Sequence, residues 1–201
     1  MSTNPAYTTF RINIDNSWTT LDFADLFAGL EFLHMVYSLQ STTAAEIDRI
    51  NRLAALEVWW KDHKVLREFP AHSASDLFLA AFLDRKTPFQ VRQVSFASPG
   101  FADIAGLGSI VKEVRLFISG IIDKWVASED RKIARDSARQ DVLEKRLKNA
   151  VVAVELADKA GLSKEAQRII VEAIFETSRM IEAKVARGKI TSIEHQSGPD
   201  D

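Results

Sequence analysis

The stretch "FASPGFADIAGLGS", residues 96–109, separates a predicted strand from the most regular apolar helix pattern in the chain. Pro99 fixes its own backbone and pushes the residue before it towards an extended conformation, while Gly100 permits a positive φ. Both features are typical of a strand that ends in a turn. We therefore interpret residues 100–109 as a turn that hooks its apolar side chains into the core ahead of a helix.

The same glycines raise the alternative of a phosphate-binding loop. A P-loop requires Lys and then Ser or Thr directly after its glycine-rich turn, whereas Ile110 follows Ser109 here. A dinucleotide-binding fingerprint requires a third glycine, and Val111 stands in its place. The match to either motif is weak, so a phosphate- or nucleotide-handling protein is kept as an alternative. Its candidate anion-binding residues are Ser98, Gly100, Gly106, Gly108 and Ser109.

The helix pattern that follows has apolar residues spaced alternately by four and three positions. This is the a/d spacing by which helices pair in coiled coils. Further apolar residues widen the stripe, and a helix with so broad an apolar face requires several neighbours. The core of the same chain or a second copy could supply them, and both alternatives stay open. The seam consists of Leu107, Val111, Val114, Ile118, Ile121 and Trp125.

A polar segment lies between two apolar ones in residues 107–160, so the pattern does not decide between one helix and two. Gly161 suits the left-handed position after a helix end, and Ser163 suits the N-cap of the next helix. Such a short break predicts an antiparallel helical hairpin. Val151 and Val152 flank the hairpin seam on opposite sides, so we expect them to be partly exposed. The predicted hairpin interface residues are Leu147, Val151, Val154, Ile170, Ile174 and Ile181.

The N-terminal part of the chain carries nearly all the aromatic residues, since only Phe175 lies beyond Trp125. Aromatic side chains dominate compact cores, so this part is predicted to be globular. Alternating apolar and polar residues predict strands near 7–15 and 89–96, with helices between them. The pattern does not decide whether these two strands run parallel or antiparallel.

These patterns predict an α+β, mostly α fold: a compact helical head with a small two-stranded β element, followed by a long helix and an antiparallel helical hairpin. We expect the globular head to span residues 1–125 and the helical hairpin extension to span residues 126–187. Residues 188–201 are rich in polar residues and are expected to form a disordered tail.

Composition limits the chemistry that the chain can perform. It contains no cysteine, which excludes disulfide frameworks and Cys-ligated zinc, and its four histidines show no metal-ligand spacing. Thr19 and Asp22 are three residues apart, the spacing of a capping box at the start of a helix. Asp22 and Asp25 share a face in the first turn of that helix, which makes them a candidate for a weak cation site, but acids there suit the helix dipole without a metal. We expect neither a metal nor a cofactor. The chain shows no signal peptide and no apolar span, so we expect a cytoplasmic protein.

The net charge of −2 gives no reason to expect a polyanionic partner. The basic segment at 131–148 lacks aromatic residues and is interrupted by acids, so we expect no nucleic-acid partner. A membrane-active helix over Leu107–Val126 is a further alternative, although its polar residues are of both signs. We predict a non-enzymatic, self-associating scaffold, adaptor or regulatory protein that acts through helical interfaces. Its expected partners are copies of itself, or another protein bound at the helical hairpin.

Overall fold

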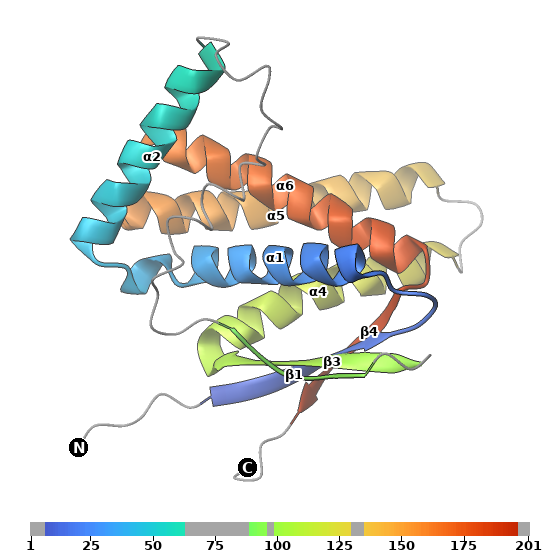
Figure 1. Cartoon of the computed structure of the whole chain (residues 1–201). Helices are drawn as coiled ribbons and strands as arrows, with labels where there is room; N and C mark the ends of the chain where they lie inside the picture. Colours follow the sequence, from blue (N-terminus) through green and yellow to red (C-terminus); the bar gives the residue numbers. More distant parts are fainter. Residues whose placement is uncertain (1–6, 63–88, 96–98, 130–134, 197–201) are drawn as a thin grey trace.

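The computed structural model describes residues 7–62, 89–95, 99–129 and 135–196, in which helices cover one face of a four-stranded sheet (Figure 1). The elements follow one another as β1 (Tyr7–Ile14), α1 (Thr20–Tyr37), the short 3-10 helix η1 (Leu39–Ser41), α2 (Ala44–Asp62), β2 (Gln90–Ser95), β3 (Gly100–Leu107), α4 (Gly108–Glu129), α5 (Arg135–Lys159), α6 (Lys164–Ala186) and β4 (Ile190–Gln196).

The sheet has the strand order β2-β3-β1-β4, and every neighbouring pair is antiparallel. Strands β1 and β2 therefore point in the same direction with β3 between them, and β3 and β4 do so with β1 between them. This is the split β-α-β arrangement, in which the helical connections leave and rejoin the sheet on one side. The sheet thus joins the first and last described elements of the chain.

The prediction of a two-stranded β element is wrong, because residues 100–107 form the central strand β3 instead of a turn. Ile104 lies opposite Phe10 on β1 and Val91 on β2, so β3 separates the two predicted strands. The segment is rich in glycine and alanine, which have low strand propensity. Pairing along both edges outweighs that local preference, and no pattern within the segment signals it.

The prediction of a disordered tail from residue 188 is wrong for residues 190–196, which form the edge strand β4 against β1. Ile190 and Ile193 are three positions apart, so the segment lacks the strict alternation of a strand. An irregularity in the ladder near Asn13 and Ile14 absorbs the extra residue. Ile190 is buried and Ile193 packs against the core.

One hydrophobic cluster fills the space between the sheet and the helices. It takes side chains from the expected head, such as Phe10 and Leu33, and from the expected extension, such as Ile170 and Ile174. Helix α6 packs on α1, α2, α4 and α5, so it is surrounded by other helices. The helical extension therefore shares its buried side chains with the head of the molecule.

Several local predictions are confirmed. Thr19 forms the predicted capping box at the start of α1, and the Ser163 hydroxyl accepts a hydrogen bond from the backbone N–H of Ala166 at the start of α6. Gly161 has a φ of 84°, as expected for the residue that ends α5. The open question over residues 107–160 is answered by two helices, α4 and α5, which contact each other.

Candidate functional site

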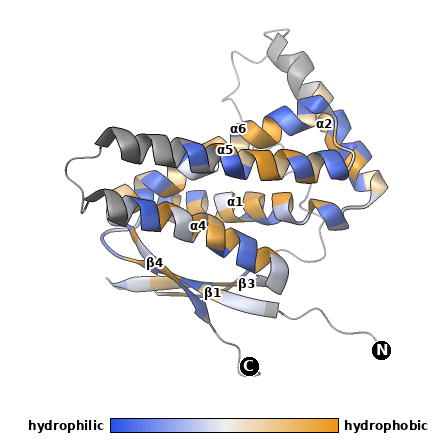
Figure 2. Cartoon of the chain, turned by 180° about the vertical axis from the view of Figure 1, so that it is seen from behind, coloured by the Kyte–Doolittle hydropathy of each residue, from blue (hydrophilic) through white to orange (hydrophobic). Residues whose placement is uncertain are grey.

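Helix α5 turns one side to the core and the other to the surface. Ala150, Ala153 and Ala157 are buried, and these small side chains lie on the side that packs against α6, α4 and α1. Their spacing of three and four residues places them on one face of the helix. Figure 2 shows α4 and α5 at the front of the molecule with α1 behind them, and hydrophobic segments on both helices.

The opposite side of α5 exposes large apolar side chains. Leu147 is 56% exposed, Val151 is 55% exposed and Val152 is 39% exposed. The partial exposure of Val151 and Val152 confirms the expectation from the sequence. A single exposed leucine or valine is ordinary on a protein surface, but three within six positions of one helix form a local patch.

Charged residues surround these three apolar ones. Glu144, Lys148, Glu155 and Lys159 are exposed and alternate in sign along the helix. They are four or seven positions apart in sequence order, so they lie on one side of α5, the side that carries Val151 and Val152. We call this surface the outward face of α5, which consists of Glu144, Leu147, Lys148, Val151, Val152, Glu155 and Lys159.

The seam predicted on α4 lies almost wholly inside the molecule. Its middle positions are buried against α1, α6 and the sheet, and its two ends are half-buried and pack against the same core. Of the two alternatives left open, the core of the chain itself supplies the neighbours that the broad apolar face requires. The buried seam residues are Val111, Val114, Ile118 and Ile121, and the half-buried ones are Leu107 and Trp125.

The hairpin residues predicted as an interface divide between the core and the surface. On α6, Ile170, Ile174 and Ile181 are buried, so they are not accessible to a partner of the folded chain. On α5, Val154 is half-buried at the border between the two sides of the helix. Among the predicted hairpin residues, Leu147 and Val151 are therefore the exposed ones, and the structure places them four residues apart on the outward face of α5.

The predicted anion-binding turn is replaced by strand β3 over most of its length. Gly100 and Gly106 lie within the strand, where both are paired with β1 in an extended backbone that is not gathered around an anion. Gly106 has no room for a side chain, because a Cβ there would lie 2.7 Å from the ring of Phe89. Gly108 and Ser109 begin α4, and Ser98 lies outside the described residues.

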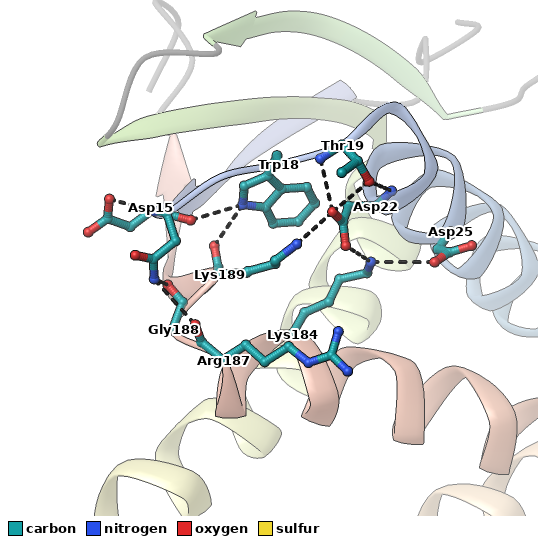
Figure 3. A network of polar contacts seen from close by, with 10 residues as sticks. Asp15, Trp18, Thr19, Asp22, Asp25, Lys184, Arg187, Gly188 and Lys189 are labelled. Atoms are coloured by element: carbon teal, nitrogen blue, oxygen red, sulfur yellow. Dashed lines mark hydrogen bonds and ion pairs between the residues drawn. The ribbon is translucent and has the colours of Figure 1, made fainter.

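Asp22, considered above as a cation ligand, is held by two lysines from the C-terminal end of the chain (Figure 3). Its carboxylate accepts hydrogen bonds from Lys184 Nζ at 3.1 Å and from Lys189 Nζ at 2.6 Å. Asp25 lies 3.5 Å from Lys184, whose side chain is only 6% exposed, and both ammonium groups lie near the ring of Trp18.

These contacts neutralise the two acids without a metal ion. The hydrogen bond from Lys189, followed by that from the backbone N–H of Thr19, holds the pKa of Asp22 far below its usual range. The cluster joins the start of α1 to the end of α6 and to the residue before β4. Among the described residues, no group of three or more His, Asp or Glu side chains is placed to hold a metal.

A second polar arrangement lies on the face of the sheet opposite the helices. Arg11 on β1 donates to both carboxylate oxygens of Asp103 on β3, at 2.7 Å and 2.8 Å, and its guanidinium lies 3.7 Å from the ring centre of Phe101. The hydrogen bond with Asp103 raises the pKa of Arg11. Sequence reasoning missed this pair, because it requires β3 to be recognised as a strand beside β1.

The histidines are not brought together in the described part of the chain. His34 is buried in α1 with its ring centre 4.5 Å from that of Phe89, whereas His195 is exposed on the edge strand β4. His63 and His72 lie outside the described residues. The buried position of His34 is in keeping with the structural role that its apolar sequence neighbours favour.

No described helix has the length and apolar character required to cross a bilayer. Comparisons with protein-family models, with curated proteins and with solved structures found no match for this chain. The outward face of α5 is the candidate functional site, because it combines exposed large apolar side chains with exposed charged ones.

Proposed function

We propose that this protein is a non-enzymatic scaffold, adaptor or regulatory component that self-associates through the outward face of α5. The observation that carries the proposal is the exposure of Leu147, Val151 and Val152 on one helix of a chain whose other predicted interface residues are buried or half-buried. Burying such side chains between two copies removes apolar surface from water, which favours association by roughly 25 cal/mol per Å².

The residues around the apolar patch support a protein partner over a membrane. Glu144, Lys148, Glu155 and Lys159 provide both signs of charge at the rim, as polar rims do at protein interfaces. A membrane-binding helix would carry mainly lysine and arginine there. Most apolar residues of α4 are buried in the core and Leu116 alone is exposed among its described large apolar residues, so release of the others would require the fold to open.

The patch is small, which predicts weak and reversible association. Interfaces that bury less than about 1,200 Å² in total belong to transient complexes, and dissociation constants near 1 µM correspond to about −8 kcal/mol. We therefore expect a micromolar dissociation constant. Such an affinity suits a component whose assembly responds to its own concentration.

Light scattering of the full chain during size exclusion, over a range of micromolar loading concentrations, tests the proposal. The expected result is a mass that rises with concentration from 22.5 kDa towards twice that value. Leu147→Gln should reduce the rise, whereas Leu21→Gln should leave it unchanged, because Leu21 is also an exposed leucine but lies on α1. A constant monomer mass for the unaltered chain would overturn the proposal.

A further inference from the structure

The charges on the outward face of α5 form a self-complementary pattern. Glu144 and Lys159 lie equally far from the midpoint between Val151 and Val152, and so do Lys148 and Glu155. In each of these two pairs, one residue is acidic and the other is basic. If a second copy is related to the first by a twofold rotation about that midpoint, an acidic residue of one copy therefore lies opposite a basic residue of the other at both distances.

We infer that two copies of this chain associate with their α5 helices antiparallel, centred between Val151 and Val152, with Lys148 of each copy opposite Glu155 of the other. This arrangement rests on the proposed self-association and specifies its geometry. It also brings Glu144 opposite Lys159 at both ends of the contact. The apolar side chains of Leu147, Val151 and Val152 then lie between the charged pairs.

Each of the four charged side chains is available for such a pairing. All are exposed, and none forms an ion pair with another described side chain. Some other charged residues on the helices form ion pairs within the chain, as Arg168 does with Glu172 on α6 and Arg52 with Asp48 on α2. The unengaged charges on α5 are grouped around its exposed apolar residues, which is the arrangement expected at the rim of an interface.

The opposite helix orientation is disfavoured by the same charges. A parallel pair of α5 helices would place Lys148 opposite Lys148 and Glu155 opposite Glu155, and like charges in register repel. Interactions between exposed charges add little affinity. Their main effect is to disfavour arrangements that bring like charges together. The charge pattern is therefore expected to set the orientation, while the valines and Leu147 supply the attraction.

Charge reversal provides the first test, by sedimentation equilibrium of the full chain. Lys148→Glu and Glu155→Lys should each weaken self-association about tenfold, since each creates two like-charge contacts per dimer. An equimolar mixture of the two variants should associate at least as well as the unaltered chain, because every contact in the mixed dimer is again between opposite charges. The doubly exchanged chain should also recover.

Matched controls separate these contacts from a change in net charge. Arg179→Glu and Glu176→Lys make the same charge changes at exposed positions of α6, and we expect them to have no effect on association. The far-ultraviolet circular dichroism and thermal midpoint of each variant should match those of the unaltered chain. High salt should weaken association of the unaltered chain and should reduce the difference between it and the charge variants.

Disulfide trapping provides a second test, and the chain contains no cysteine of its own. Val151→Cys should form a covalent dimer under mild oxidation. Lys148→Cys alone should not, because the two copies of residue 148 would be about 10 Å apart along the helix axis. A mixture of Lys148→Cys and Glu155→Cys should form the covalent heterodimer.

The outcomes distinguish the two proposals. If the unaltered chain self-associates but charge reversal has no effect, or if Lys148→Cys forms a covalent dimer by itself, the antiparallel arrangement is overturned while self-association stands. If the unaltered chain remains a monomer, both proposals fail. Rescue in the mixture of Lys148→Glu and Glu155→Lys supports both.

Discussion

Helices α4 and α5 carry similar apolar spacings in sequence. The large apolar side chains in the middle of the α4 seam are buried inside the molecule, whereas those on the outward face of α5 are exposed to solvent. Ile118 and Val114 of α4 are completely buried, whereas Leu147 and Val151 of α5 are more than half exposed. The difference follows from their neighbours. Helix α4 packs against the sheet as well as α1, α5 and α6. The described part of α5 contacts helices but no strand, and its fully buried side chains are alanines.

This comparison shows that helical periodicity identifies the apolar stripes on a helix but does not show which stripe faces the core. Around α5 two stripes overlap, one of alanines and one containing Leu147 and Val151. Small side chains allow helices to approach closely, so the alanine stripe faces the core although each alanine buries less apolar area than a leucine. Large apolar residues are consequently left on the surface, and the sequence pattern alone favours the opposite assignment.

The largest expected effect contrasts one residue from each helix. Ile118→Ala should lower the free energy of unfolding by about 4 kcal/mol, because it leaves a cavity in a completely buried position. Val151→Ala should change it by less than about 0.5 kcal/mol while weakening self-association. Urea denaturation of both variants at low protein concentration measures the difference. Similar losses for the two variants would contradict the contrast between the helices.

A second comparison concerns the acids at the start of α1. Asp22→Asn should lower the free energy of unfolding by about 3 kcal/mol, because it leaves the largely buried ammonium groups of Lys184 and Lys189 poorly compensated. Asp25→Asn is the matched control and should cost less than about 1 kcal/mol, since Asp25 is 46% exposed. Equal losses in the same urea experiment would show that burial of the lysines does not matter.

The pH dependence of stability sharpens that comparison. The pKa of Asp22 is lowered in the folded chain, mainly by the hydrogen bond from Lys189, so its contribution is complete above the unfolded value near 3.9 and is lost as the pH falls below it. The stability difference between the unaltered chain and Asp22→Asn should therefore shrink on acidification to about pH 3. A difference that is constant or grows on acidification would contradict the proposed cause.

The smallest expected effect concerns the space around two glycines, Gly106 on β3 and Gly29 on α1. Gly106→Ala should cost about 2 kcal/mol, because its Cβ would lie 2.7 Å from the Phe89 ring and 3.2 Å from Val111. Gly29→Ala should cost less than about 1 kcal/mol: its Cβ would meet the tip of Met180, which can move away, and would lie 3.2 Å from Thr177, but alanine is the better helix former. Thermal denaturation of the two variants measures the difference, and a larger loss for Gly29→Ala would contradict this account.

The exposed pair Val151 and Val152 was predictable, because their position relative to the hairpin seam depends only on helical geometry. It was not predictable whether the α4 seam packs within the chain or against another copy, because periodicity does not identify the neighbours of an apolar stripe. The lysine cluster at Asp22 was also missed. Lys184 and Lys189 are more than 160 positions away in the sequence, and no local pattern relates them to the start of α1.

The sequence by itself determined the features that depend on neighbouring residues: the cap at Thr19, the left-handed turn at Gly161, the cap at Ser163 and the strand character of β1 and β2. Capping hydrogen bonds, backbone sterics and alternation act within a few residues and are encoded there. Only the tertiary structure decided that residues 100–107 and 190–196 are strands and which side of α5 faces outward. Strand pairing and helix packing depend on partners distant in the chain, whose contacts outweigh weak local preferences.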